Sequence, residues 1–208
     1  MIAKKSLGKT MPRPSNKEER RKQIVQGLLE VMSEKGYENA SIQEIGKACG
    51  LTPGLIHYHF KSKQEILVAL IKSLSSLAQE RYEGLLEGAE NPREKLEAFI
   101  DAALALGEGA DEKAVSAWVV IGAEAIRQPE VQILYQEIIE RNKLELMELL
   151  ASCGSEANAE LTDTKIKNIA MMSLSSIVGA YQLATTAKDI APRNYASDTL
   201  KQFLFDFF

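Results

Sequence analysis

The side chains best suited to chemistry follow one another closely at His57, Tyr58, His59, Lys61 and Lys63. Imidazole, phenol and ammonium groups can bind metal ions, act as general acids or bases, or hydrogen-bond to nucleic acid. On a helix, however, His57 and His59 point about 200° apart, so they cannot easily share one metal ion. The group therefore favours hydrogen bonding to a polar partner over metal binding.

Signatures of catalysis are missing from the sequence. It contains no Gly-rich phosphate loop, no Gly-x-Ser-x-Gly elbow and no Cys-x-x-Cys pair. Its two cysteines, Cys49 and Cys153, stand apart from any cluster of ligands and provide no disulfide framework. No signal peptide is evident, and no apolar run is long enough to span a bilayer. We therefore expect a cytoplasmic protein without membrane contact that is not an enzyme and needs no cofactor or metal.

The elements that must position these side chains are two short helices joined by a tight turn. Ile42, Ile45 and Ala48 recur at a spacing of three and line one face of the first helix. Gly50 ends that helix, because glycine adopts a left-handed backbone without a Cβ penalty. Thr52 is then a good N-cap for a second helix of about two turns. A short helix that exposes so many hydrogen-bonding groups is typical of the recognition helix of a helix-turn-helix.

The run of residues 40–67 resembles the DNA-binding signature of the TetR family of transcriptional regulators. It has a small residue before the first helix, a glycine at the turn, an aromatic step at 57–60 and Lys-x-Lys at 61–63. The resemblance extends from about Arg20 to about Leu70 and implies double-stranded operator DNA as a partner. The residues expected to contact DNA are Ser41, Thr52, Pro53, Gly54, His57, Tyr58, His59, Lys61 and Lys63.

Core packing is the alternative role for part of this set. Any one of Tyr58, His59 and Phe60 can instead pack in the core, and for Phe60 we expect this.

The charge of the chain is unevenly distributed. Residues 1–63 contain twelve Lys/Arg and six Asp/Glu, a net charge of +6, whereas the rest of the chain carries −10. A basic first third before an acidic remainder is typical of a nucleic-acid-binding module on a body that does not bind nucleic acid. Chance segregation of charge on two solvated faces is the alternative explanation.

The apolar periodicity after residue 92 is helical throughout, and no segment alternates with a period of two. We therefore predict an all-α fold of about nine helices, in which a three-helix helix-turn-helix domain precedes a larger helical domain. A helix stop is expected at Gly36, a break at 107–110 and a loop at 152–158. The expected organisation is a basic flexible arm at 1–14, the DNA-binding domain at 15–62, and an effector-binding and dimerisation domain at 63–208 that begins with a connecting helix at 63–83.

The acidic body is the expected place for ligand binding. The family resemblance implies a ligand-sensing, dimerising domain here, and residues 117–135 further resemble the choline-responsive BetI-like subgroup. That resemblance implies a cationic ligand, which Trp118 would hold through cation–π attraction. The residues expected to line a cavity are Trp118, Glu124, Tyr135, Met171 and Tyr181, with Met172 and Gln182 as further candidates. Ordinary core packing, with methionine filling gaps, is the alternative role for each of them.

A homodimer is expected from the C-terminal end of the chain. The helix at 162–188 contains small residues that permit close helix approach, and the apolar end at 203–208 needs cover from its own core or from a partner. Helix-turn-helix proteins usually bind DNA as two-fold dimers. We therefore predict a ligand-responsive regulator, a repressor released from its operator by an unidentified small molecule through the connecting helix. The alternative is an architectural DNA-binding protein without an effector, which a sealed core would support and a cavity would oppose.

Overall fold

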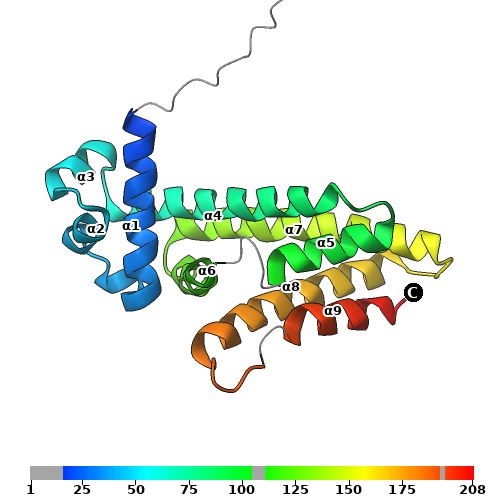
Figure 1. The fold of residues 1–208 in the computed structure, drawn as a ribbon. Helices are drawn as coiled ribbons and strands as arrows, with labels where there is room; N and C mark the ends of the chain where they lie inside the picture. The colour runs from blue at the N-terminus through cyan, green and yellow to red at the C-terminus, as the bar shows by residue number, and fades with distance from the viewer. Residues whose placement is uncertain (1–15, 105–110, 193–194) are drawn as a thin grey trace, which may run out of the picture.

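The computed structural model describes residues 16–104, 111–192 and 195–208, which form nine α-helices and no strand (Figure 1). This confirms the all-α prediction, while the arm expected at 1–14 and the break expected at 107–110 lie outside the described residues. No described helix is long and apolar enough to cross a membrane. The helices are α1 (Asn16–Asn39), α2 (Ile42–Cys49), α3 (Pro53–His59), α4 (Lys63–Leu86), α5 (Pro92–Leu104), α6 (Glu112–Ala125), α7 (Pro129–Glu156), α8 (Asp163–Thr186) and α9 (Tyr195–Phe205).

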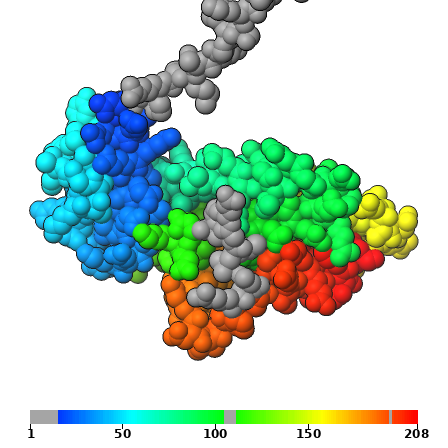
Figure 2. Space-filling view, in the orientation of Figure 1, coloured from blue at the N-terminus to red at the C-terminus, as the bar shows by residue number. Residues whose placement is uncertain are grey.

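The helices form a head of α1–α3 and an elongated body of α4–α9. Figures 1 and 2 show the head, coloured blue to cyan, at one end of the body. Helices α4 and α7 run along the body beside each other, and α8 and α9 pair along its other side. Helix α6 lies where the head meets the body and contacts α1, α7 and α8. The arrangement thus gives α6 neighbours in both parts of the molecule.

Two apolar cores hold the molecule together. The first joins α1–α3 to the N-terminal half of α4, including Ile66 and Leu70, and also takes in Ala117 and Ile121 of α6. The second joins the C-terminal end of α4 to α5, α7, α8 and α9. Helix α4 therefore belongs to both cores, and the head core is completed by α6. The boundary that we placed at residue 62 falls between two helices but not between two cores.

The helix-turn-helix is built from local signals. The Ser41 hydroxyl caps α2 by accepting a hydrogen bond from the Glu44 N–H, at 3.2 Å. Gly50 has a left-handed backbone with φ of 65° and ends the helix as expected. The predicted face of α2 is wrong at Ala48, which is exposed, because Cys49 takes its place beside Ile45 in the interior. Inward positions therefore follow a spacing of three to four rather than a strict three.

Gly46 is the point of closest approach within the turn. A Cβ added there would lie 2.6 Å from the carbonyl oxygen of Leu51, which is backbone and cannot rotate away. The Leu51 N–H also donates to the Gly46 carbonyl at 2.9 Å, so this contact fixes how α2 enters the turn. Glycine is required at this position by space rather than by backbone conformation.

Two helix ends differ from or refine the prediction. Helix α1 leaves helical geometry at Gly36, as expected, but the helical turns resume and run to Asn39. The loop expected from residue 152 is wrong, because α7 continues to Glu156. The Ser152 hydroxyl donates to the Glu148 carbonyl at 2.8 Å, and Cys153 is buried in the second core. Burial of this last turn outweighs its small, polar composition.

We predict that Gly46→Ala lowers the free energy of unfolding by about 1–3 kcal/mol, because the new Cβ would press on the Leu51 carbonyl. Urea unfolding followed by circular dichroism measures the change. Gly54→Ala is the matched control, since a Cβ there meets no atom within 4 Å. Equal stabilities for the two variants would show that the turn has room to relax.

Candidate DNA-binding face and ligand cavity

Helix α3 presents one exposed face and one buried face. Its buried side packs Ile56 against the head core, and the following Phe60 is also buried, as expected. Tyr58, by contrast, is 78% exposed. The Thr52 hydroxyl caps the helix by accepting from the Leu55 N–H at 3.4 Å. The predicted contact residues that the structure leaves exposed are Ser41, Thr52, Pro53, Gly54, His57, Tyr58 and Lys61.

His59 does not join that face. The residue is only 8% exposed, and its ring meets the Tyr58 ring edge-on with centroids 5.1 Å apart. His59 follows Ile56 by three positions, so the helical period turns it toward the core. Its Nδ1 is buried without a hydrogen-bond partner among the described residues. The structure therefore assigns His59 to packing, the alternative that the sequence left open, and corrects its place among the DNA contacts.

Arg21 holds the recognition helix in place and was not singled out from the sequence. Its guanidinium donates to the His59 carbonyl, at the C-terminal end of α3, and lies 3.8 Å from the centre of the Phe60 ring. It also lies 3.6 Å from the Glu65 carboxylate on α4. One side chain of α1 thus connects the ends of two other helices. The 38 positions between Arg21 and His59 explain why no sequence pattern revealed it.

Lys63 is also used within the protein. Its ammonium donates to the carbonyls of Tyr37 and Glu38, at 2.8 and 3.3 Å, and lies 4.2 Å from the centre of the Tyr37 ring. Partial burial lowers the pKa of Lys63, although nearby Glu124 and Glu38 oppose the shift. The amine that we expected beside a phosphate therefore secures the end of α1 in this structure.

A cavity of about 600 Å³ opens inside the body. Trp118, Tyr135 and Tyr181 line it, as the sequence predicted, together with Gln182. The Tyr181 hydroxyl donates to the Ala103 carbonyl at 2.9 Å, and burial raises the pKa of Tyr181 to about 12. Burial also raises the pKa of Tyr135. The remaining lining residues are Ser75, Ala78, Gln79, Tyr82, Phe99, Ala102, Ala103, Val119, Gly122, Ala123, Ile126, Ile138, Ile139, Arg141, Asn142, Leu174, Ile177 and Val178.

Three of the predicted lining residues lie elsewhere. Glu124 is two positions from Gly122, so it projects from another side of α6, where it is buried and accepts from the Gln128 amide at 2.7 Å. Met171 and Met172 lie on the outer side of α8 and are 40% and 60% exposed. The apolar character of these segments was read correctly, but the face of each helix was not.

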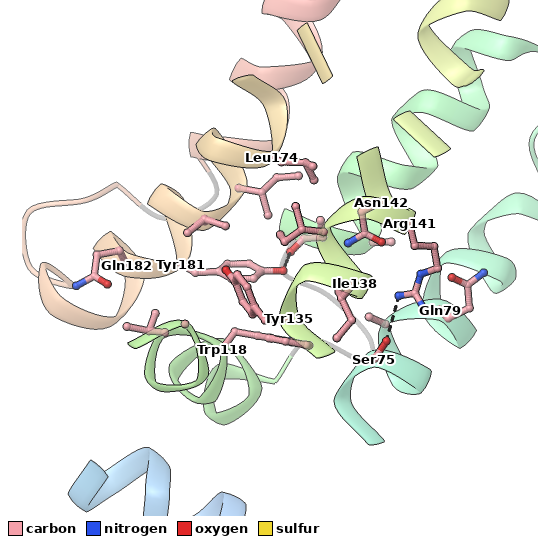
Figure 3. Close-up of a pocket in the computed structure, with 18 of the residues that line it drawn as sticks. Ser75, Gln79, Trp118, Tyr135, Ile138, Arg141, Asn142, Leu174, Tyr181 and Gln182 are labelled. Carbon is pink, nitrogen blue, oxygen red and sulfur yellow. Dashed lines mark hydrogen bonds between the residues drawn. The ribbon is translucent and has the colours of Figure 1, made fainter. Parts of the chain in front are cut away.

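The polar end of the cavity was missed by sequence reasoning. Ser75 and Gln79 of α4 meet Arg141 and Asn142 of α7 at one end, and Trp118 lies across the cavity from them (Figure 3). An Arg141 nitrogen donates to the Ser75 hydroxyl at 3.0 Å. The two helices are brought together only by the fold, since 66 positions separate the bonded pair. Among the described lining residues Arg141 alone carries a formal charge.

Comparison with known proteins identifies the family. The sequence model described as "Bacterial regulatory proteins, tetR family" matches residues 24–70, and "BetI-type transcriptional repressor, C-terminal" matches residues 92–208. The chain belongs to the TetR family of bacterial transcriptional regulators. It is a DNA-binding regulator of transcription, and none of the families that match it is enzymatic.

Proteins similar to this TetR-family chain include a BetI regulator and two regulators of similar fold solved with different ligands. The regulator BetI of Rhizobium meliloti is 31% identical over 137 residues, which cover 64% of this chain and 67% of that protein. A regulator of Saccharomonospora viridis, solved with choline, has a TM-score of 0.74 at 24% identity over 91% of this chain and 95% of its own. FadR of Bacillus subtilis, solved with stearoyl-CoA, has a TM-score of 0.73 at 22% identity over 90% and 98%. These two structural likenesses show the fold.

Lys61 and Lys63 give a matched test of which lysine meets DNA. Lys61 is exposed, and its amine forms no hydrogen bond or ion pair with the described residues. We predict that Lys61→Met lowers the salt dependence of DNA binding by about 0.9 in log–log slope for each phosphate that the lysine had neutralised. Lys63→Met should leave the slope unchanged but lower the free energy of unfolding by about 1–3 kcal/mol, since two carbonyls lose a charged donor.

Fluorescence anisotropy with labelled DNA at several salt concentrations measures the slopes, and urea unfolding measures the stabilities. A lower slope for Lys63→Met would return its amine to the phosphate contacts.

Proposed function

We propose that this protein is a homodimeric repressor that leaves its operator when a small molecule fills the cavity of the body, which helices α4 to α8 line. The observation that carries the proposal is the position of α6. One side of this helix lines the cavity with Trp118 and Gly122, and another side completes the head core with Ala117 and Ile121. A ligand that favours one position of α6 must therefore favour one position of the head.

Helix α6 offers a shorter route to the head than the connecting helix that we first expected. It packs directly on α1, to which Lys113 in its first turn and Arg127 in the turn after it are joined by ion pairs with Glu30 and Glu38. The Arg127 and Glu38 side chains are 65% and 78% exposed, so such a pair contributes at most about 1 kcal/mol. Buried packing between α6 and α1, rather than these ion pairs, is the stronger candidate for the coupling.

The exposed face of α3 supports operator binding in the major groove. Thr52, His57 and Tyr58 are the exposed groups that can hydrogen-bond to base edges or phosphates. The adjoining N-terminus of α4 can hold a phosphate through its free N–H groups. The basic character of residues 1–63 adds sequence-independent attraction to DNA. Binding to chromosomal DNA would place the protein in the cytoplasm.

The outer face of α8 and α9 supports dimerisation. It exposes Met171, Met172 and Leu183 of α8 and Phe203 of α9, which is 52% exposed. At Gly179 of α8, an added Cβ would have no atom within 4 Å, so a partner helix can approach closely. Among the closing residues 203–208, Leu204 is fully buried, which indicates that the protein's own core covers part of this segment and leaves Phe203 for a partner.

The alternative of an architectural DNA-binding protein is disfavoured by the cavity. Its volume of about 600 Å³ lies within the range of about 300–1,000 Å³ that is usual for small-molecule sites. Its lining joins apolar and aromatic surface to a few polar groups, the combination expected of a ligand site. In the described part of the chain, no cluster of His, Cys, Asp and Glu could hold a metal ion. We propose no catalytic step in the cavity.

Binding to the gene's own upstream DNA, titrated against a panel of metabolites, tests the function. Tight, salt-dependent binding that one compound releases would support the repressor, whereas binding that no compound alters would favour the architectural alternative.

Ile121→Val then tests the route of coupling, because it removes one methyl group from the α6–α1 packing at a fully buried position. We predict that the ratio of operator affinities without and with the releasing compound falls about two- to tenfold, following a loss of about 0.5–1.5 kcal/mol. Ile100→Val is the matched control, since Ile100 is equally buried but belongs to the second core. A ratio that changes equally in both variants would contradict coupling through α6.

Met172→Glu tests the dimer face. A symmetric interface would bring two like charges together, at a cost of several kcal/mol, so we expect dimerisation to weaken about a hundredfold or more. Leu85→Glu is the control, because Leu85 is 42% exposed on α4, away from this face. Sedimentation equilibrium reports the association constant. A dimer that survives Met172→Glu unchanged would move the interface elsewhere.

A further inference from the structure

The cavity has two unlike ends. Ser75, Gln79, Arg141 and Asn142 gather at one end, whereas aromatic and aliphatic side chains form most of the rest, with Gln182 as a single polar amide on the opposite side (Figure 3). Polar atoms that converge at one end of a mostly apolar site fix the orientation of a ligand. A ligand that satisfied this cavity would therefore have one polar end and an apolar body.

Arg141 determines the charge of that polar end. Its guanidinium has five N–H donors in a planar fork that matches a carboxylate, and its hydrogen bond to Ser75 uses only part of them. No carboxylate among the described residues lies within 4.0 Å of it, since none of the ion pairs includes Arg141. Arg141 is exposed as a residue although it lines the cavity, which places it at the mouth.

A cationic ligand finds less support in the same cavity. The Trp118 and Tyr135 rings, with centroids 6.5 Å apart, offer faces to a cation. Yet no acidic side chain is among the described lining residues, and Arg141 would repel a second positive charge. The volume of about 600 Å³ also exceeds what a cation of a few heavy atoms would fill.

We propose that the effector is an amphipathic anion, whose carboxylate or equivalent group binds Arg141 at the mouth while its apolar body lies against Trp118, Tyr135 and Leu174. Ser75 orients the guanidinium, and Gln79 and Asn142 supply further hydrogen bonds to the anion. The regulatory consequence rests on the proposed function, but the binding itself does not.

Three probes with one apolar chain and different heads test the ligand class: decanoate, decan-1-ol and decyltrimethylammonium, each below its critical micelle concentration. Isothermal titration calorimetry on the full chain without DNA measures their affinities, with choline as a fourth probe. We expect decanoate to bind about tenfold more tightly than the alcohol, and the cation more weakly than both. Equal or tighter binding of decyltrimethylammonium, tight binding of choline alone, or binding of no probe would overturn the proposal.

Variants locate the anion. Arg141→Gln should weaken decanoate about tenfold and leave decan-1-ol unchanged, whereas Arg141→Lys should keep most of the preference for the anion. Arg93→Gln makes the same charge change outside the cavity, where Arg93 stacks on Phe205, and should alter neither affinity. Circular dichroism confirms that each variant is folded. An unchanged decanoate affinity in a folded Arg141→Gln protein would also overturn the proposal.

DNA binding is read separately, so the two proposals fail in different ways. Arg141-dependent binding of decanoate that leaves operator affinity unchanged would uphold the ligand class and contradict release of DNA by this ligand. Release of the operator by choline but not by decanoate would uphold the switch and contradict the anionic ligand.

Discussion

The position of α6 is set jointly by the head and by the body, because the helix packs against both. Ala117 and Ile121 are fully buried against the head, while Trp118 and Gly122 face the cavity of the body. Close-packed interiors transmit displacement because they have few voids to absorb it. The cavity leaves α6 without close packing on one of its sides. The position of the helix therefore depends on what fills that space. In the proposed mechanism, α3 acquires that dependence through α1, which contacts both α6 and α3.

The head is the part of the fold that the sequence predicted best, because its signals are local. Ser41, Thr52 and Ser62 each cap the helix that follows, and each bond spans only three positions. Gly50 stops α2 through its own backbone conformation. Such features depend on neighbouring residues alone, and short-range chemistry is visible in a sequence. The same locality let the family resemblance be recognised from residues 40–67.

The incorrect predictions concern which side of a helix faces the interior. His59, Glu124 and Met171 all lie on helices that were predicted correctly, yet each faces a direction set by distant packing. Arg21 and Arg141 were overlooked for a related reason, since their partners lie 38 and 66 positions away along the chain. The family resemblance implied a ligand-sensing body, and Trp118, Tyr135 and Tyr181 were predicted correctly to line a cavity, but only the meeting of α4 and α7 created its polar end.

The sharing of the head core has a consequence for how such regulators can recombine. If residues 16–62 were grafted onto another body, Ile24 and its neighbours would lose the buried surface that α6 and the first half of α4 provide. A chimera would then have to carry the head-facing side of α6 along with the DNA-binding segment. The DNA-binding head and the body that holds the cavity are therefore not separable modules in this protein, because α4 belongs to both cores and no linker divides them.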